Sequence, residues 1–138
     1  MSIFVDTSAF LALVNRDEAN HIAASTTWVD LIQRGEDLVS TNYVLLETFA
    51  LVQRRHGLPT VRTLQQAIDA VVHIHWIDAS VHAIGAAAVF STNRRQLSLV
   101  DCASFETMRR LGIGTAFAFD EHFVEQGFTC LPQQGQAS

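Results

Sequence analysis

Short apolar runs that end at a polar or acidic residue alternate along this chain with longer stretches of helical periodicity. The first run, Ile3–Val5, ends at Asp6 and is followed by apolar residues at helical spacing. Later strand-like runs cover residues 37–41, 73–78 and 116–119. An order of strand, helices, strand, helices is typical of an α/β domain, so we predict a three-layer sandwich with a mainly parallel central sheet.

The stretches between these runs carry helix start and stop signals. We predict helices over residues 21–33, 44–55, 60–72, 80–90 and 99–112. Asn42 is expected to cap the second of them, and Ser98 the last. No linker or repeat interrupts the pattern, which indicates one domain over residues 1–132 and a flexible tail at residues 133–138.

Bulk properties limit where such a chain works. Its 138 residues are 49% hydrophobic, enough for one sizeable core. No apolar stretch approaches the roughly 18 residues of a membrane span, and the N-terminus lacks the basic region of a signal peptide. We therefore expect a cytoplasmic protein without membrane contact, whose two cysteines, Cys102 and Cys130, serve as buried apolar residues.

Charge excludes several kinds of chemistry. The formal net charge of -5 argues against indiscriminate coating of nucleic acid, so any contact with it must be local. All nine basic residues are arginine. The absence of lysine excludes a P-loop lysine and a Schiff base, and it weighs against phosphatase or phosphoacceptor domains, which ordinarily require one. Arg94 and Arg95, in a polar loop, are candidate phosphate contacts.

Two acidic residues directly follow predicted strands. Asp6 follows Ile3–Val5, and Asp120 follows the run Ala116–Phe119. Sites in open α/β sheets gather at the carboxyl ends of the strands, so both acids are expected at one edge. Each also has a plain structural explanation, because aspartate is a good N-cap and a helix is predicted after both positions.

Two further acids lie on predicted helices. Asp101 stands three residues after Ser98, the spacing of a capping box. Glu47 has apolar helical neighbours, including Val44 and Leu51, so we expect its carboxylate on a buried face in need of a cation. Several carboxylates without a histidine motif favour Mg²⁺ or Mn²⁺ over zinc.

Four segments together resemble the PIN domain family, and most closely its VapC toxins. They are DTSAF, NYVLLETFALVQRRHG, LSLVDCASFETMRRLGI and AFAFDEHF, in this order along the chain. The resemblance runs from Ile3 to about Leu131. It implies that Asp6, Glu47, Asp101 and Asp120 bind Mg²⁺ or Mn²⁺ and are catalytic, with Ser8 in a supporting position.

What the resemblance implies is a metal-dependent endoribonuclease acting as the toxin of a type II toxin-antitoxin pair. It further implies a homodimer and a cognate antitoxin protein that covers the site. Two alternatives stay open, namely a PIN-like binding module without catalysis and a PIN nuclease of RNA processing.

Overall fold

The computed structural model describes residues 1–133 and is an α/β fold, as predicted. The elements follow in the order β1 (Ser2–Val5), α1 (Thr7–Val14), α2 (His21–Gln33), β2 (Asp37–Thr41), α3 (Asn42–His56), α4 (Leu58–Val71), β3 (Val72–His75), α5 (Ala79–Thr92), α6 (Leu99–Leu111), β4 (Thr115–Phe117), α7 (His122–Glu125) and β5 (Thr129–Leu131). Residues 134–138, most of the predicted tail, lie outside the described residues, so the boundary at residue 132 stays a prediction.

All the strand pairings are parallel within residues 1–133. The sheet has the order β3-β2-β1-β4-β5. Phe4 of the central strand β1 lies opposite Val39 of β2 and Ala116 of β4. Because neighbouring strands run the same way, their carboxyl ends share one edge of the sheet, and Asp6 follows the central strand at that edge.

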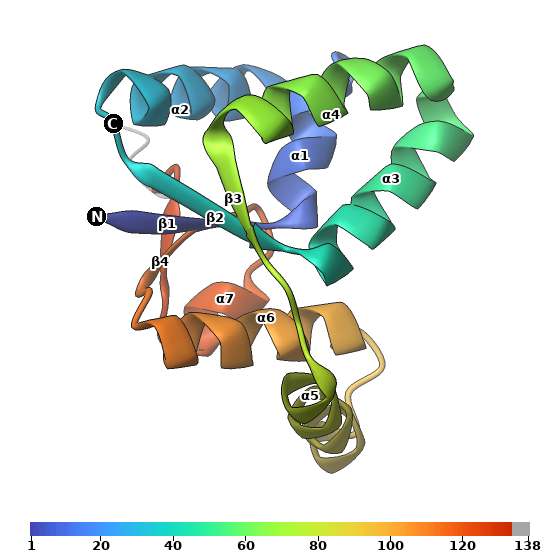
Figure 1. Ribbon diagram of the computed structural model, residues 1–138, viewed down its shortest axis with the longest axis vertical. Coiled ribbons are helices and arrows are strands. Elements are labelled where there is room, and N and C mark those ends of the chain that lie inside the picture. Colours follow the sequence, from blue (N-terminus) through green and yellow to red (C-terminus); the bar gives the residue numbers. More distant parts are fainter. Residues whose placement is uncertain (134–138) are drawn as a thin grey trace.

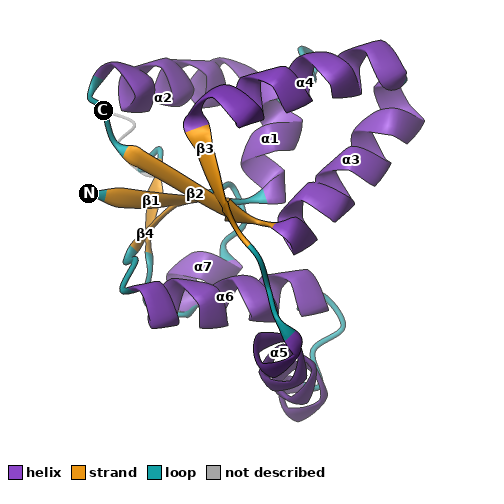
Figure 2. Cartoon of the chain, viewed as in Figure 1, coloured by secondary structure: helices purple, strands orange, loops and turns teal. Residues whose placement is uncertain are grey.

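Helices cover both faces of the sheet and complete the predicted three layers. Figure 1 shows α1, α2 and α4 on one side of the sheet, and α6 and α7 on the other. The colouring by secondary structure in Figure 2 makes the sheet between the two helical layers easy to follow. Among the described residues, no helix is long and apolar enough to cross a membrane.

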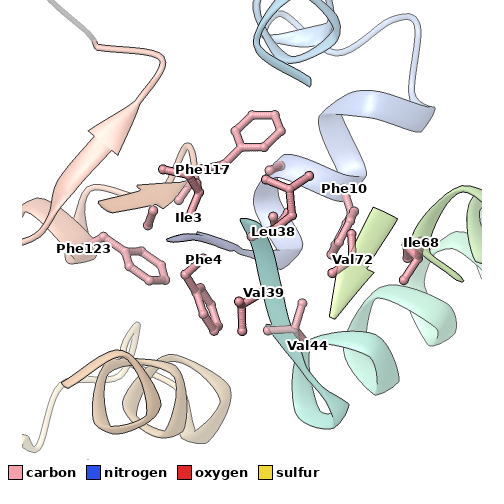
Figure 3. Packing of buried hydrophobic residues seen from close by; sticks show 14 of the residues in the cluster. Ile3, Phe4, Phe10, Leu38, Val39, Val44, Ile68, Val72, Phe117 and Phe123 are labelled. Atoms are coloured by element: carbon pink, nitrogen blue, oxygen red, sulfur yellow. The ribbon is translucent and has the colours of Figure 1, made fainter. Parts of the chain in front are cut away.

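The core lies on both faces of β1. Ile3, Phe4 and Val5 are each fully buried, as expected of a parallel strand covered from both sides. In Figure 3, Phe4 and Val39 point to one side of the sheet while Leu38 points to the other. The central strand is therefore fixed by packing in two layers, which also fixes the position of the acid that follows it.

Asn42 does not cap α3, contrary to the prediction. Thr41 does so instead, because its hydroxyl accepts a hydrogen bond from the Val44 N–H at 3.2 Å. The side chain of Asn42 accepts a hydrogen bond from the Ile77 N–H at 2.7 Å, 35 residues further along the chain. The strand predicted over residues 73–78 is β3 (Val72–His75) in the structure, so Ile77 lies after the end of this strand.

Other boundaries also differ from the predictions. α4 begins at Leu58, because Pro59 fits the first turn of a helix, where an N–H has no helical partner. β4 ends at Phe117 and not at Phe119, whose N–H donates to the Ser8 hydroxyl at 2.9 Å. The edge strand β5 is an addition to the predicted elements. Its three residues are too few to show a period in the sequence.

Candidate active site

Asp6 lies between β1 and α1 and is held from both. Its N–H donates to the Phe117 carbonyl of β4 at 3.1 Å. Its carboxylate caps α1 and accepts hydrogen bonds from the Ser8 N–H at 3.1 Å and from the Ser8 hydroxyl at 2.7 Å. The same hydroxyl accepts from the Phe119 N–H, so Ser8 connects the acid after β1 to the segment after β4.

Burial dominates the electrostatics of Asp6. The residue is only 3% exposed, and burial raises its pKa from 3.8 to about 7. The hydrogen bonds from Ser8 oppose this rise, whereas the negative charges of Asp101 and Asp120 add to it. Within the described part of the chain, no arginine or histidine forms an ion pair with Asp6. Asp6 is thus a buried acid that lacks a cation among these residues.

Asp101 completes a capping box at the start of α6. The Ser98 N–H donates to the Asp101 carboxylate at 3.0 Å, and the Asp101 N–H donates to the Ser98 hydroxyl at 3.1 Å. The capping interpretation of this residue is therefore confirmed. Burial raises the pKa of Asp101, and the nearby charges of Asp120 and Glu47 contribute to the rise. Capping does not remove the repulsion from neighbouring acids.

Asp120 stands three residues after the end of β4, just before α7. One carboxylate oxygen accepts a hydrogen bond from the His122 N–H at 2.9 Å. The side chain is 25% exposed. Asp120 is not the N-cap residue of α7, which is Glu121, but it binds the first helical N–H as a capping side chain would.

Glu47 is half-buried, so the expectation that it lies on a buried face is wrong. The buried face of α3 carries Val44, Thr48 and Val52. On the remaining surface, Leu46 is 72% exposed. The apolar residues of α3 are therefore not confined to the face that packs on the core, so apolar neighbours alone do not establish that Glu47 is buried. Glu47 nevertheless lies near enough to Asp101 for its negative charge to raise the pKa of Asp101.

The four acids form one electrostatically coupled group. Asp6 interacts with Asp101 and Asp120, and Asp101 interacts with Asp120 and Glu47. They come from segments far apart in the sequence, which the parallel sheet and the starts of α1, α3 and α6 bring together. However, no three histidine, cysteine, aspartate or glutamate side chains in residues 1–133 converge into a group that could hold a metal ion. The acids are neighbours without forming a closed coordination shell.

The chemistry of this group fits a hard divalent cation. It consists of carboxylate oxygens, the ligands that Mg²⁺ and Mn²⁺ prefer. Burial is the main cause of the raised pKa values of Asp6 and Asp101, and a positive ion among the acids would offset the mutual repulsion that adds to the rise.

A hollow of about 1220 Å³ opens beside Asp120. Its lining includes Ser8, Phe119 and His122. It also includes Cys130, whose thiol pKa is raised to about 11 by burial and, to a lesser extent, by Asp120 and Asp6. The sequence did not indicate this hollow, because its walls come from α1, α7, β5 and the segment after β4.

Arg94, a candidate phosphate contact, is engaged in an ion pair. Its guanidinium lies 2.9 Å from the Glu125 carboxylate and is also 3.4 Å from the His122 ring. Arg94 is the main reason that the pKa of Glu125 is lowered. Arg95 is exposed beside it. His122 and Glu125 are 28 and 31 residues away from Arg94 in the sequence, so only the fold brings the three side chains together.

Comparisons with known proteins identify the family of the chain and agree with its fold. The sequence profile of the PIN domain matches residues 3–128. VapC20 of Mycobacterium tuberculosis, described as a 23S rRNA-specific endonuclease, is 34% identical to this chain over 127 residues. The match covers 91% of this chain and 95% of VapC20, and it is the same for the proteins of strains CDC 1551 and H37Rv. The crystal structure of VapC20, described there as a Sarcin-Ricin loop cleaving toxin, superposes with a TM-score of 0.82 at 32% identity, covering 92% of this chain and 96% of VapC20. The chain belongs to the PIN domain family.

Proposed function

We propose that this protein is a metal-dependent endoribonuclease and the toxin of a type II toxin-antitoxin pair. The observation that carries the proposal is the electrostatic interaction that links Asp6, Glu47, Asp101 and Asp120 at the sheet edge of a PIN domain. Similarity to VapC20 over nearly the whole of both chains supports the ribonuclease assignment.

The four acids hold Mg²⁺ or Mn²⁺ in this proposal. When bound, such a cation would neutralise phosphate charge and lower the pKa of a bound water, so that the water could act as a nucleophile at neutral pH. Asp6, the most buried of the four acids, would hold the ion together with Asp101 of α6 and Glu47 of α3. Asp120 completes the set from the segment before α7.

Other side chains prepare the site and the substrate. The Ser8 hydroxyl favours the ionised form of Asp6 by donating to its carboxylate. Arg95 and the exposed side of Arg94 bind phosphates that flank the cleaved bond. With a net charge of -5, the protein relies on such local contacts to bind RNA.

The proposal includes partners. A cognate antitoxin covers the acidic site, for which an arginine side chain is the complementary group. We further propose a homodimer in the cytoplasm. Size-exclusion chromatography with light scattering tests the dimer, and co-expression with a small gene adjacent to the one that encodes this protein tests the antitoxin. A toxicity that this gene leaves unchanged would remove the antitoxin from the proposal.

A cleavage assay tests the central claim. The purified protein is incubated with ribosomal RNA, transfer RNA and messenger RNA in Mg²⁺, and cleavage sites are mapped by primer extension. We expect defined cuts that disappear with EDTA and in Asp6→Asn, a variant that keeps the size and the hydrogen-bond acceptor of the side chain. The exposed Asp30→Asn serves as the matched control and should cut like the wild type. Full activity of Asp6→Asn would refute the assignment.

One observation favours an alternative function. Among residues 1–133 the acids interact electrostatically without forming a closed metal site, and a PIN-like binding module without catalysis is the alternative to a nuclease. Calorimetric titration with Mn²⁺ separates the two functions. A nuclease binds the ion through the four acids and loses this binding in Asp6→Asn, whereas a silent module shows no binding in either protein.

A further inference from the structure

An ion pair joins the segments that precede Asp101 and follow Asp120. Arg94 lies between α5 and α6, and Glu125 ends α7. The Arg94 Nη1 and the Glu125 Oε2 are 2.9 Å apart, although 31 residues separate them in the sequence. The pair therefore connects α7 to the segment that leads into α6.

His122 fills the space between this pair and Asp120. Its Nδ1 lies 3.2 Å from the Glu125 Oε2 and 3.4 Å from the Arg94 Nη2. Its Nε2 lies 3.9 Å from the Asp120 Oδ1, the same oxygen to which the His122 N–H donates at 2.9 Å. Both contacts to Asp120 thus come from one residue, whose other ring nitrogen, Nδ1, faces the Arg94–Glu125 pair and can donate to the Glu125 carboxylate.

Two features suggest that Asp120 needs other residues to hold it in place, namely the charge of the neighbouring acids and the short length of α7. Asp101 and Asp120 repel each other, since the charge of Asp120 raises the pKa of Asp101. The Ser98 capping box fixes Asp101 at the start of α6. Asp120, in contrast, leads into a helix of four residues that has little structure of its own to resist displacement.

We propose that Arg94 and Glu125 are positioning residues for Asp120. Their ion pair draws α7 toward the start of α6, and the His122 ring then keeps the Asp120 carboxylate close to Asp101. This inference rests on the proposed function, because Asp120 needs a defined position only if it helps to bind the cation. Residues that orient the ligands of a metal site commonly change its affinity by about 10- to 100-fold.

The competing explanation is that Arg94 serves only to bind RNA. Loss of Glu125 separates the two roles. If Arg94 only binds phosphate, Glu125→Gln frees its guanidinium and removes a negative charge, so KM for RNA should fall. If the pair positions Asp120, the same variant weakens cation binding and lowers kcat.

The experiment measures Mn²⁺ affinity by calorimetric titration and kcat and KM by RNA cleavage. The variants are Arg94→Gln, Glu125→Gln and their combination. Glu106→Gln is the matched control, since it breaks another arginine–glutamate pair, with Arg110 on α6. We expect each single variant to weaken Mn²⁺ binding on the order of tenfold and to lower kcat. The double variant should lose little more, because both substitutions break the same pair.

Arg94→Lys adds a conservative test, since a lysine keeps the charge and should restore most of the Mn²⁺ affinity. Unchanged Mn²⁺ binding in Glu125→Gln, or an equal loss in Glu106→Gln, would overturn the positioning role while leaving the proposed function intact. If the wild type itself neither binds Mn²⁺ nor cleaves RNA, the proposed function fails and this proposal falls with it. Thermal melting of each variant verifies that the fold is preserved.

Discussion

At the scale of single residues, capping and electrostatic strain occur together in the same acids. The sequence indicated that Asp6 and Asp101 could each be explained as capping residues, and both do accept hydrogen bonds at the start of a helix. Capping alone does not require either acid to be buried beside other acids. The raised pKa values of Asp6 and Asp101 show that burying these acids beside one another disfavours their charged forms. From the sequence, only the order of the strands could suggest that the acids lie together.

Asp6 should make the stability of the metal-free protein depend on pH. Its pKa is about 7 when folded and 3.8 when unfolded, so between these values the folded protein holds a proton that the unfolded chain has released. The contribution of Asp6 to the free energy of unfolding is therefore highest below about pH 4, declines as the pH rises, and is lost once the pH passes about 7. We expect wild type to lose about 2 kcal/mol relative to Asp6→Asn between pH 5 and 7.5. Urea unfolding in EDTA measures this, and parallel pH profiles would contradict it.

Ser8 should support both the fold and the ionisation of Asp6. Ser8→Ala leaves the Phe119 N–H without its acceptor and removes the hydroxyl that donates to Asp6. We expect a loss of about 1 to 3 kcal/mol in the free energy of unfolding. Mn²⁺ affinity should fall as well, since Asp6 becomes harder to ionise. Ser8→Thr keeps the hydroxyl and is the control. Equal Mn²⁺ affinity in Ser8→Ala and wild type would show that this hydroxyl is only structural.

At the scale of elements, the long helices and the central strand were predictable and the short elements were not. The capping box at Ser98 and the apolar run at Ile3–Val5 are local signals, and both were correctly interpreted. β5 has three residues at the sheet edge and is defined only by its pairing with β4. The exchange of roles between Thr41 and Asn42 depends on Ile77, a contact that no local pattern encodes.

The start of α6 allows the capping role of Asp101 to be separated from its proposed catalytic role. Asp101→Asn keeps an oxygen that can accept from the Ser98 N–H, so thermal stability should change little. RNA cleavage should be abolished, because the charge is lost. Ser98→Ala should do the opposite, costing about 1 kcal/mol of stability while retaining cleavage. An Asp101→Asn variant that still cuts RNA would reduce this acid to a capping residue.

At the scale of the whole molecule, the parallel sheet explains why acids from distant segments meet. With β1 in the centre and β4 beside it, the segments carrying Asp6 and Asp120 leave the sheet at the same edge. The alternation of strands and helices in the sequence predicts a parallel sheet, so it could be expected that Asp6 and Asp120 lie near each other. Their distances could not, because they depend on how α3, α6 and α7 pack against that edge.

A cation that binds this edge should stabilise the entire domain. Binding to the folded state alone raises the free energy of unfolding by about 2.7 kcal/mol at a ligand concentration of 100 Kd. For a domain of this size, such a gain corresponds to a rise in Tm of roughly 5 to 10 °C. We expect this rise with Mn²⁺ at constant ionic strength in wild type and in Asp30→Asn, whose substitution lies on the exposed side of α2. It should vanish in Asp6→Asn combined with Asp101→Asn, because that protein lacks two of the acids that attract the ion. An equal rise in all three proteins would mean that the ion acts by general screening of negative charge and has no site among these acids.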